Sequence, residues 1–107
     1  MILISKHIVP KGFEGITLFP FIFLKIKKLK SDKTLINHEK IHLQQQKELG
    51  ILFFFIFYGL EYLFRWMQYK NCSLAYQNIS FEREAYQNEK NYNYLSKRKW
   101  WAFLKYL

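Results

Sequence analysis

The chain has 107 residues, of which half are apolar and 21% are aromatic, and this composition excludes an intrinsically disordered protein. The length fits one small domain, and the lone cysteine excludes both an intramolecular disulfide and a cysteine-rich zinc site. The net charge of +9 favours anionic partners. Among these, a membrane surface is preferred to nucleic acid, because the aromatic residues are expected at core positions on helices and no nucleic-acid motif is present.

The N-terminal part is expected to form a β-hairpin. Residues 2–9 (ILISKHIV) and residues 16–27 (ITLFPFIFLKIK) are apolar and β-branched, so both predict strands. The segment PKGFEG between them has the glycines and proline of a turn. Pro20 lies inside the second run and places that part of it at a sheet edge or a bulge.

A helix is expected to begin near Leu35, after a polar loop in which Asp32 or Thr34 can cap it. Gly50 either interrupts this helix or passes through it as a tolerated residue. A second, very apolar helix is expected over about residues 51–69.

The rest of the chain is expected to be a loop and two further helices. KNCSLAYQN follows the apolar helix as a loop or short turn, in which Cys72 is expected to be buried. Ser80 can cap a third helix, FEREAYQNEKNYNYL, and KWWAFLKYL forms a short aromatic helix at the end. The predicted fold is therefore α+β and mainly α, with an N-terminal β-hairpin packed on a helical body.

The stretch LGILFFFIFYGL, residues 49–60, raises the question of a membrane. It carries no charge, but it is shorter than the roughly twenty residues that a transmembrane helix needs. A buried core helix is the first interpretation, and a re-entrant or interfacial helix is the second. A membrane surface would be contacted through residues 49–67 and the basic, aromatic residues 97–107. Because no secretory signal peptide is evident, the protein is expected to be cytoplasmic or membrane-associated.

The segment INHEKIHLQQQKE, residues 36–48, contains the pattern H-E-x-x-H. His38 and His42 are four positions apart, so a helix stacks them on one face, where both imidazoles can bind one metal ion. Glu39 lies about a third of a turn away and can act on a water molecule at the open coordination position. The pattern therefore predicts two zinc ligands and a glutamate that acts as general acid and base.

A catalytic zinc ion needs a third protein ligand. His7 is one possibility, but it lies in a predicted strand far upstream. Residues 80–89 (SFEREAYQNE) offer Glu82, Glu84 and Glu89 at the start of a helix or within it. Glu82 and Glu84 also suit the N-terminal end of a helix dipole, so the residues alone leave the third ligand open.

Taken together, HEKIH and FEREAY resemble the gluzincin metallopeptidases, which bind zinc through H-E-x-x-H and a glutamate on a later helix. The segment EREA, which begins at Glu82, is similar to the E-x-x-A of the later motif. The resemblance therefore implies Glu82 as third ligand, with Glu84 in reserve. Tyr86 stands where that motif has an aspartate that orients a ligand histidine, and Glu84 or Glu89 is expected to replace it. HLQQQ also looks like the H-x-x-Q-Q of small zincin-like domains, and the whole chain looks like a family of short proteins from Bacteroidetes.

The resemblance implies one minimal zincin-like domain over residues 1–107 that hydrolyses peptide bonds with Zn²⁺. Candidates for stabilising the transition state are Tyr76, Tyr86 and Tyr92. A strand edge within residues 16–24 is expected to hold an extended peptide or protein substrate beside the metal. The alternatives are a non-catalytic zinc-binding or membrane-associated interaction protein and a helical domain without a metal.

Overall fold

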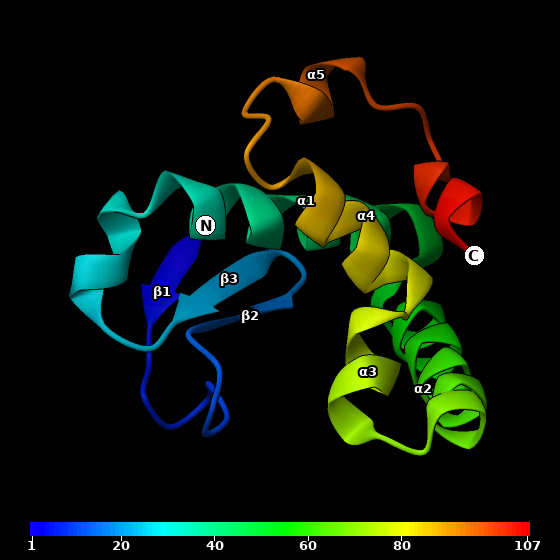
Figure 1. Cartoon of the computed structure of the whole chain (residues 1–107). Coiled ribbons are helices and arrows are strands. Elements are labelled where there is room, and N and C mark those ends of the chain that lie inside the picture. The colour runs from blue at the N-terminus through cyan, green and yellow to red at the C-terminus, as the bar shows by residue number, and fades with distance from the viewer.

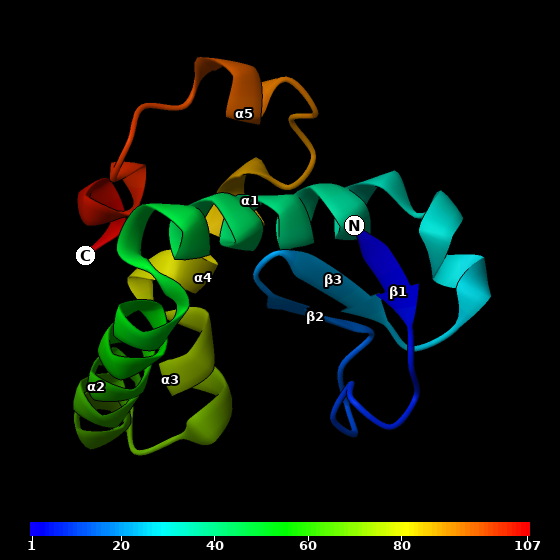
Figure 2. The same ribbon diagram turned by 180° about the vertical axis from the view of Figure 1, so that it is seen from behind.

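A long helix, α1 (Lys33–Leu49), runs across the molecule, and the other elements pack around it (Figure 1). The computed structural model describes residues 1–107. A small sheet lies under one end of α1, and helices α2 (Ile51–Tyr69) and α3 (Cys72–Gln77) lie under the other end. Helix α4 (Ser80–Asn88) packs against α1, and the view from behind in Figure 2 shows the same arrangement. The expected α+β, mainly α fold is confirmed.

The sheet has three strands, and its topology differs from the predicted hairpin. The strands are β1 (Ile2–Ile4), β2 (Gly15–Leu18) and β3 (Phe21–Leu24), in the order β1-β3-β2. The run 16–27 folds back at Phe19-Pro20, so it supplies both β2 and β3, which pair antiparallel. Strand β1 pairs in parallel with β3 and ends well before residue 9. Proline lacks an N–H group, and a turn is a place where that loss removes no ladder hydrogen bond.

Local signals set the limits of α1 as expected. The side chain of Asp32 accepts a hydrogen bond from the backbone N–H of Leu35 at 3.0 Å, which caps the first turn. Gly50 has a φ of 81°, a left-handed conformation that favours glycine. The chain bends by 110° there, so Gly50 separates α1 from α2.

The segment KNCSLAYQN is a short helix, α3, where a loop was predicted. Asn71 provides the cap that the prediction missed, because its side chain accepts from the backbone N–H of Leu74 at 3.0 Å. Cys72, at the first position of α3, is exposed and not buried. Ser80 is the first residue of α4 and not its cap, since its hydroxyl and its backbone N–H both donate to Glu61.

The predicted third helix ends at Asn88, and a separate helical turn, α5 (Tyr94–Lys97), follows it. The side-chain nitrogen of Asn37 explains this end, because it lies 2.8–3.1 Å from the carbonyl oxygens of Asn88, Glu89 and Asn91. Carbonyl groups at a helix end need such partners. Two 3₁₀ helices, η1 (Lys27–Ser31) and η2 (Ala102–Tyr106), complete the chain.

The main apolar cluster joins α2, α4 and η2 through Phe54, Ile79, Phe81 and Phe103. Across the molecule, eleven buried side chains are apolar and ten are polar or charged. A polar share of this size is unusual, because buried polar groups destabilise a fold unless they are hydrogen-bonded. Most of the buried polar groups lie on α1 and α4, which directs attention to the contact between these two helices.

The expectation that the apolar stretch forms a buried core helix is wrong. Of the residues of α2, only Phe54 is buried, and side chains such as Leu52 and Phe64 are more than 60% exposed. No single helix is long and apolar enough to cross a membrane. Helices α1 and α2 reach the necessary length and apolar composition only as a pair, and this pair is bent by 110°.

Candidate metal centre

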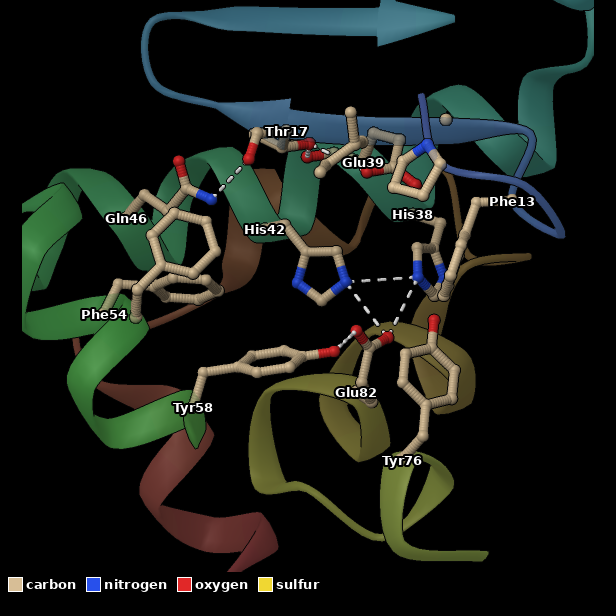
Figure 3. Close-up of a pocket in the computed structure, with 14 residues that line it drawn as sticks. Phe13, Thr17, His38, Glu39, His42, Gln46, Phe54, Tyr58, Tyr76 and Glu82 are labelled. Atoms are coloured by element: carbon tan, nitrogen blue, oxygen red, sulfur yellow. Dashed lines mark hydrogen bonds and ion pairs between the residues drawn. The ribbon is translucent and has the colours of Figure 1, made fainter. Parts of the chain in front are cut away.

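Three side chains from α1 and α4 meet at one point (Figure 3). The Nε2 atoms of His38 and His42 are 3.2 Å apart. The Oε1 atom of Glu82 lies 3.3 Å from the first of these nitrogens and 3.1 Å from the second. All three residues are buried. The structure thus brings together the three residues that the motif and the resemblance named.

The size of this triangle suits a bound divalent ion. Nitrogen and oxygen ligands lie about 2.0–2.1 Å from a tetrahedral zinc ion, which separates them from one another by about 3.3–3.4 Å. The three observed separations, 3.1–3.3 Å, are close to this value. The group could therefore hold a metal ion without rearrangement of the helices.

Glutamine 45 determines which nitrogen of His42 carries the proton. The side-chain nitrogen of Gln45 donates to the backbone carbonyl of Phe81 at 3.1 Å and to Oε1 of Glu84 at 3.0 Å. Its oxygen therefore faces Nδ1 of His42, at 2.8 Å, and must accept from it. With the proton on Nδ1, the lone pair of Nε2 points to the centre, as metal binding requires.

Glu89 has the same role for His38. Its Oε1 atom lies 2.9 Å from Nδ1 of His38, and a carboxylate can only accept from that nitrogen. The backbone carbonyl of Glu89 is one of the three that Asn37 contacts, so the end of α4 is held against α1 at this point. Of the two glutamates that the resemblance suggested as partners of a histidine in place of an aspartate at position 86, Glu89 is the one in contact with a histidine of the group.

Glu84 lies outside the centre and forms part of a buried ion network. It pairs with Arg98, which also pairs with Glu48, and the three side chains are at most 1% exposed. The hydroxyl of Tyr94 donates to Glu84 at 2.6 Å. This network holds the carboxylate that orients Gln45, so Glu84 acts on the centre through Gln45 and not as a ligand.

The carboxylate of Glu82 uses its two oxygens for different partners. The hydroxyl of Tyr58 donates to Oε2 at 2.7 Å, which leaves Oε1 for the centre. Burial raises the pKa of Tyr58, and the charge of Glu82 raises it further, so the hydroxyl stays protonated as a donor. Sequence analysis did not identify Tyr58, and no pattern in the apolar helix distinguishes it from its aromatic neighbours.

The charges of the centre attract one another strongly in the metal-free chain. Burial by itself lowers the pKa of His42, but the charge of Glu82 and its hydrogen bond outweigh burial and raise that pKa to about 9. Burial by itself raises the pKa of Glu82, but His42 and His38 hold it well below its usual range. A divalent ion would replace the proton that these groups share.

Glu39 lies beside the centre and is not part of the triangle. Its carboxylate accepts a hydrogen bond from the hydroxyl of Thr17 on β2 at 2.8 Å, and both residues are buried. Gly15 of β2 packs directly on Glu39, since a side-chain carbon there would be in ordinary van der Waals contact with the Cγ atom of Glu39, at 3.5 Å, and tight against the side chain of Leu24, at 3.2 Å. The helix thus presents the two histidines to one side and the glutamate to the strand.

A cavity of about 170 Å³ opens beside these residues. It is lined by the three residues of the triangle, by Glu39, by β2 and by aromatic side chains of α2. Figure 3 shows Tyr76 on the wall opposite Glu39. Burial raises the pKa of Tyr76, and the charge of Glu82 raises it further, so its hydroxyl remains protonated. A second hollow, lined by His38, Glu39, Tyr76 and Tyr86 among others, adjoins the first.

The other candidate residues are placed elsewhere. His7 is exposed after β1 and does not join the group. Tyr86 packs edge-on against the ring of His38, with 4.6 Å between ring centroids, and its hydroxyl lies 3.3 Å from that of Tyr76. The hydroxyl of Tyr92 lies 3.0 Å from that of Thr34, outside the cavity. Of the three tyrosines that the sequence analysis named, Tyr76 is therefore the one that lines the cavity with the three residues of the triangle.

Several supporting residues were missed by sequence analysis. Gln45 belongs to the H-x-x-Q-Q pattern noted in the sequence, but its role as a partner of His42 was not predicted, although side chains three apart share a helix face. Thr17, Tyr58 and Arg98 carry no such signal, since they come from other elements.

No family model matches the chain, and no match is found among curated proteins or solved structures.

Proposed function

We propose that the protein is a zinc-dependent metallopeptidase in which His38, His42 and Glu82 bind the ion. One observation carries the proposal: the three ligand atoms form a buried triangle with sides of 3.1–3.3 Å. The remaining nitrogen of each histidine faces an acceptor, so both rings present lone pairs to the same point. When both rings are neutral, the two lone pairs and the carboxylate oxygen are three acceptors that face one another, and a shared proton or a metal ion must lie between them. Two histidines and one carboxylate are the ligands of several catalytic zinc sites.

Zinc bound there would supply a positive charge that polarises a carbonyl group and favours deprotonation of water. Glu39 is placed to take a proton from the attacking water, because its carboxylate lines the same cavity. As the oxygen bonds to the carbonyl carbon, that proton moves to Glu39. It then moves to the amine nitrogen as the C–N bond breaks, leaving an amine and a carboxylic acid, which loses its proton to water and becomes a carboxylate. The hydrogen bond from Thr17 would keep Glu39 pointed at the cavity.

The edge of β2 is the proposed site for the substrate backbone. In an antiparallel pair, every second residue directs its N–H and C=O groups away from the partner strand. Thr17 does so, because its carbonyl accepts from the side chain of Gln46 at 2.7 Å. The same glutamine accepts from the backbone N–H of Phe19 at 2.7 Å, so it covers that end of the edge. Gly15 and the N–H of Thr17 remain to pair with an extended peptide beside the centre.

Tyr76 is the proposed donor to the oxygen that gains charge in the transition state. It lines the cavity with Glu82 and Glu39, and its protonated hydroxyl is suited to donate. Tyr86 lies behind it and would orient that hydroxyl.

Metal analysis of untagged protein tests the ion. We expect one zinc ion per chain after reconstitution, and its loss in His42→Ala. His7→Ala is the matched control, because His7 is exposed and lies outside the group. A wild-type chain that takes up no zinc at neutral pH would contradict the proposal.

Hydrolysis of an unfolded protein, with products identified by mass spectrometry, tests the catalytic step. Glu39→Gln should keep its zinc but lose about 10²–10⁴-fold in rate, the usual contribution of general acid–base catalysis. Gln87→Glu, which makes the reverse change at an exposed position of α4 outside both hollows, should leave the rate unaltered. If the wild type binds zinc and cleaves nothing, the centre is a non-catalytic metal site and the peptidase part of the proposal is wrong.

A further inference from the structure

Helix α2 directs its apolar side chains outward, whereas a helix on a protein surface usually directs them inward. Its outer side is apolar along its whole length and carries no charge. Six of the side chains on that side are 46–67% exposed: Leu52, Ile56, Leu60, Leu63, Phe64 and Met67. A surface helix normally directs such a stripe inward, and apolar patches of this extent mark contact sites.

Two polar side chains of α2, Glu61 and Tyr58, contact the rest of the protein, whereas Arg65 bonds Gln68 of α2 itself at 3.0 Å. Glu61 accepts from the backbone N–H of Ser80 at 2.8 Å and from the hydroxyl of the same residue. Tyr58 donates to Glu82 at 2.7 Å. Because these contacts fix the rotation of α2 about its axis, the apolar side cannot turn inward without breaking them.

The width of the apolar surface distinguishes between possible occupants. At about 100° per residue, the exposed arc from Trp66 through Leu60 to Phe57 covers roughly half of the circumference of the helix. A second helix, as in a dimer, would cover only a narrow seam. A lipid surface can cover the whole arc at once.

The end of the chain lies beside the junction of α1 and α2, because the backbone N–H of Trp101 donates to Glu48 at 2.9 Å, and it carries residue types that suit a lipid headgroup region. Phe103 of η2 packs into the same cluster as Phe54 of α2. Beside it, Trp100, Trp101 and Leu104 are 43–62% exposed. Lys97, Lys99 and Lys105 lie among them in sequence, and the whole chain has a net charge of +9. Tryptophan and basic residues favour the interface of anionic membranes.

We propose that the outer side of α2, together with η2, binds the surface of a bilayer that contains anionic phospholipids. The helix lies along the membrane plane, because α3 packs against it and the chain bends by 110° at Gly50 (Figures 1 and 2). Its apolar side chains enter the boundary between headgroups and acyl chains, and the sheet stays in water. This binding does not depend on a metal ion.

Flotation of the full-length chain with vesicles tests the proposal. Vesicles of phosphatidylglycerol and phosphatidylcholine should carry the wild-type protein upward, and vesicles of phosphatidylcholine alone should carry less. The double variant Leu60→Glu with Phe64→Glu should bind at least about tenfold more weakly, because it places charges in the apolar side. The matched control is Ile8→Glu with Ile26→Glu, which changes two exposed isoleucines elsewhere and should bind like the wild type.

A second measurement uses the wild type alone. Its three tryptophans, Trp66, Trp100 and Trp101, all lie on the proposed surface and are exposed. Brominated acyl chains in the vesicles should therefore quench most of the fluorescence. Absence of quenching, or equal loss of binding in both double variants, would overturn the proposal. The proposal would also be overturned if the wild type were a dimer that does not bind vesicles and if the variant Leu60→Glu with Phe64→Glu were a monomer. A second copy of the chain would then cover the surface.

Discussion

Helices α1 and α2 follow each other in the chain, but they distribute polar and apolar residues in opposite ways. Helix α1 buries six polar side chains: Asn37, His38, Glu39, His42, Gln45 and Gln46. Helix α2 buries a single side chain, Phe54, and exposes most of its apolar ones. Both arrangements are unfavourable unless something compensates for them, because a buried polar group needs a partner and an apolar surface in water has none.

The two helices differ in where that compensation is found. In α1 the buried groups have partners within the protein: Gln45 bonds His42, Glu84 and Phe81, and Asn37 bonds the end of α4. The three atoms at the centre have only one another as partners, with a shared proton in the metal-free chain, and this is where we place an ion. In α2 the compensation must come from outside the chain. Unusual polarity therefore indicates function in both helices, but through an internal site in one and an external surface in the other.

Among the changes that test this comparison, Arg98→Met is expected to have the largest effect, a loss in the free energy of unfolding. This change leaves the carboxylates of Glu84 and Glu48 buried without their cation, and breaking a buried ion pair in this way costs about 3–5 kcal/mol. The free energy of unfolding, measured with denaturant at one fixed zinc concentration, should fall by that amount. Lys97→Met, which removes an exposed cation one residue away, should change it by less than about 0.5 kcal/mol. Equal effects of the two variants would show that the polar interior beside α1 does not stabilise the fold.

A smaller effect is expected from Gln45→Met, which keeps the size of the side chain but removes the acceptor for Nδ1 of His42. Loss of such an outer partner lowers metal affinity by about 10–100-fold. Competition with a zinc chelator measures this affinity, and Gln87→Met, at an exposed position of α4, is the matched control. An unchanged affinity in Gln45→Met would mean that the ion network does not orient the histidine.

The smallest effect is expected from Phe53→Ala. Phe53 is 57% exposed and its neighbour Phe54 is 2% exposed, so the two changes compare the outer and inner sides of α2. Phe54→Ala should lower the free energy of unfolding by about 3–5 kcal/mol, whereas an exposed position contributes less than about 0.5 kcal/mol. Thermal and denaturant unfolding of the vesicle-free protein measure both values. A large loss in Phe53→Ala would indicate that the outer side is already covered in solution, by a second copy of the chain.

Sequence alone determined the features that depend on neighbours within one helical turn. The spacing of His38 and His42 places them on one face of any helix, and the sequence also offered Asp32 as one of two candidate caps and Gly50 as a possible end, which the structure confirms. Capping and periodicity act between residues three or four positions apart, so they can be inferred without knowledge of the fold. The resemblance added Glu82, and the α4 helix brings that residue to the histidines.

Only the tertiary structure decided which glutamate faces which partner and which side of α2 is exposed. Glu82 and Glu84 are two positions apart, so they point to different sides of α4. The packing of Phe81 in the apolar cluster sets the rotation of this helix. As a result, Glu82 contacts His42 and Glu84 contacts Arg98. The parallel pairing of β1 with β3 and the hydrogen bond from Tyr58 likewise join segments far apart in sequence. Such contacts depend on how whole elements pack, and no local pattern of residues encodes that packing.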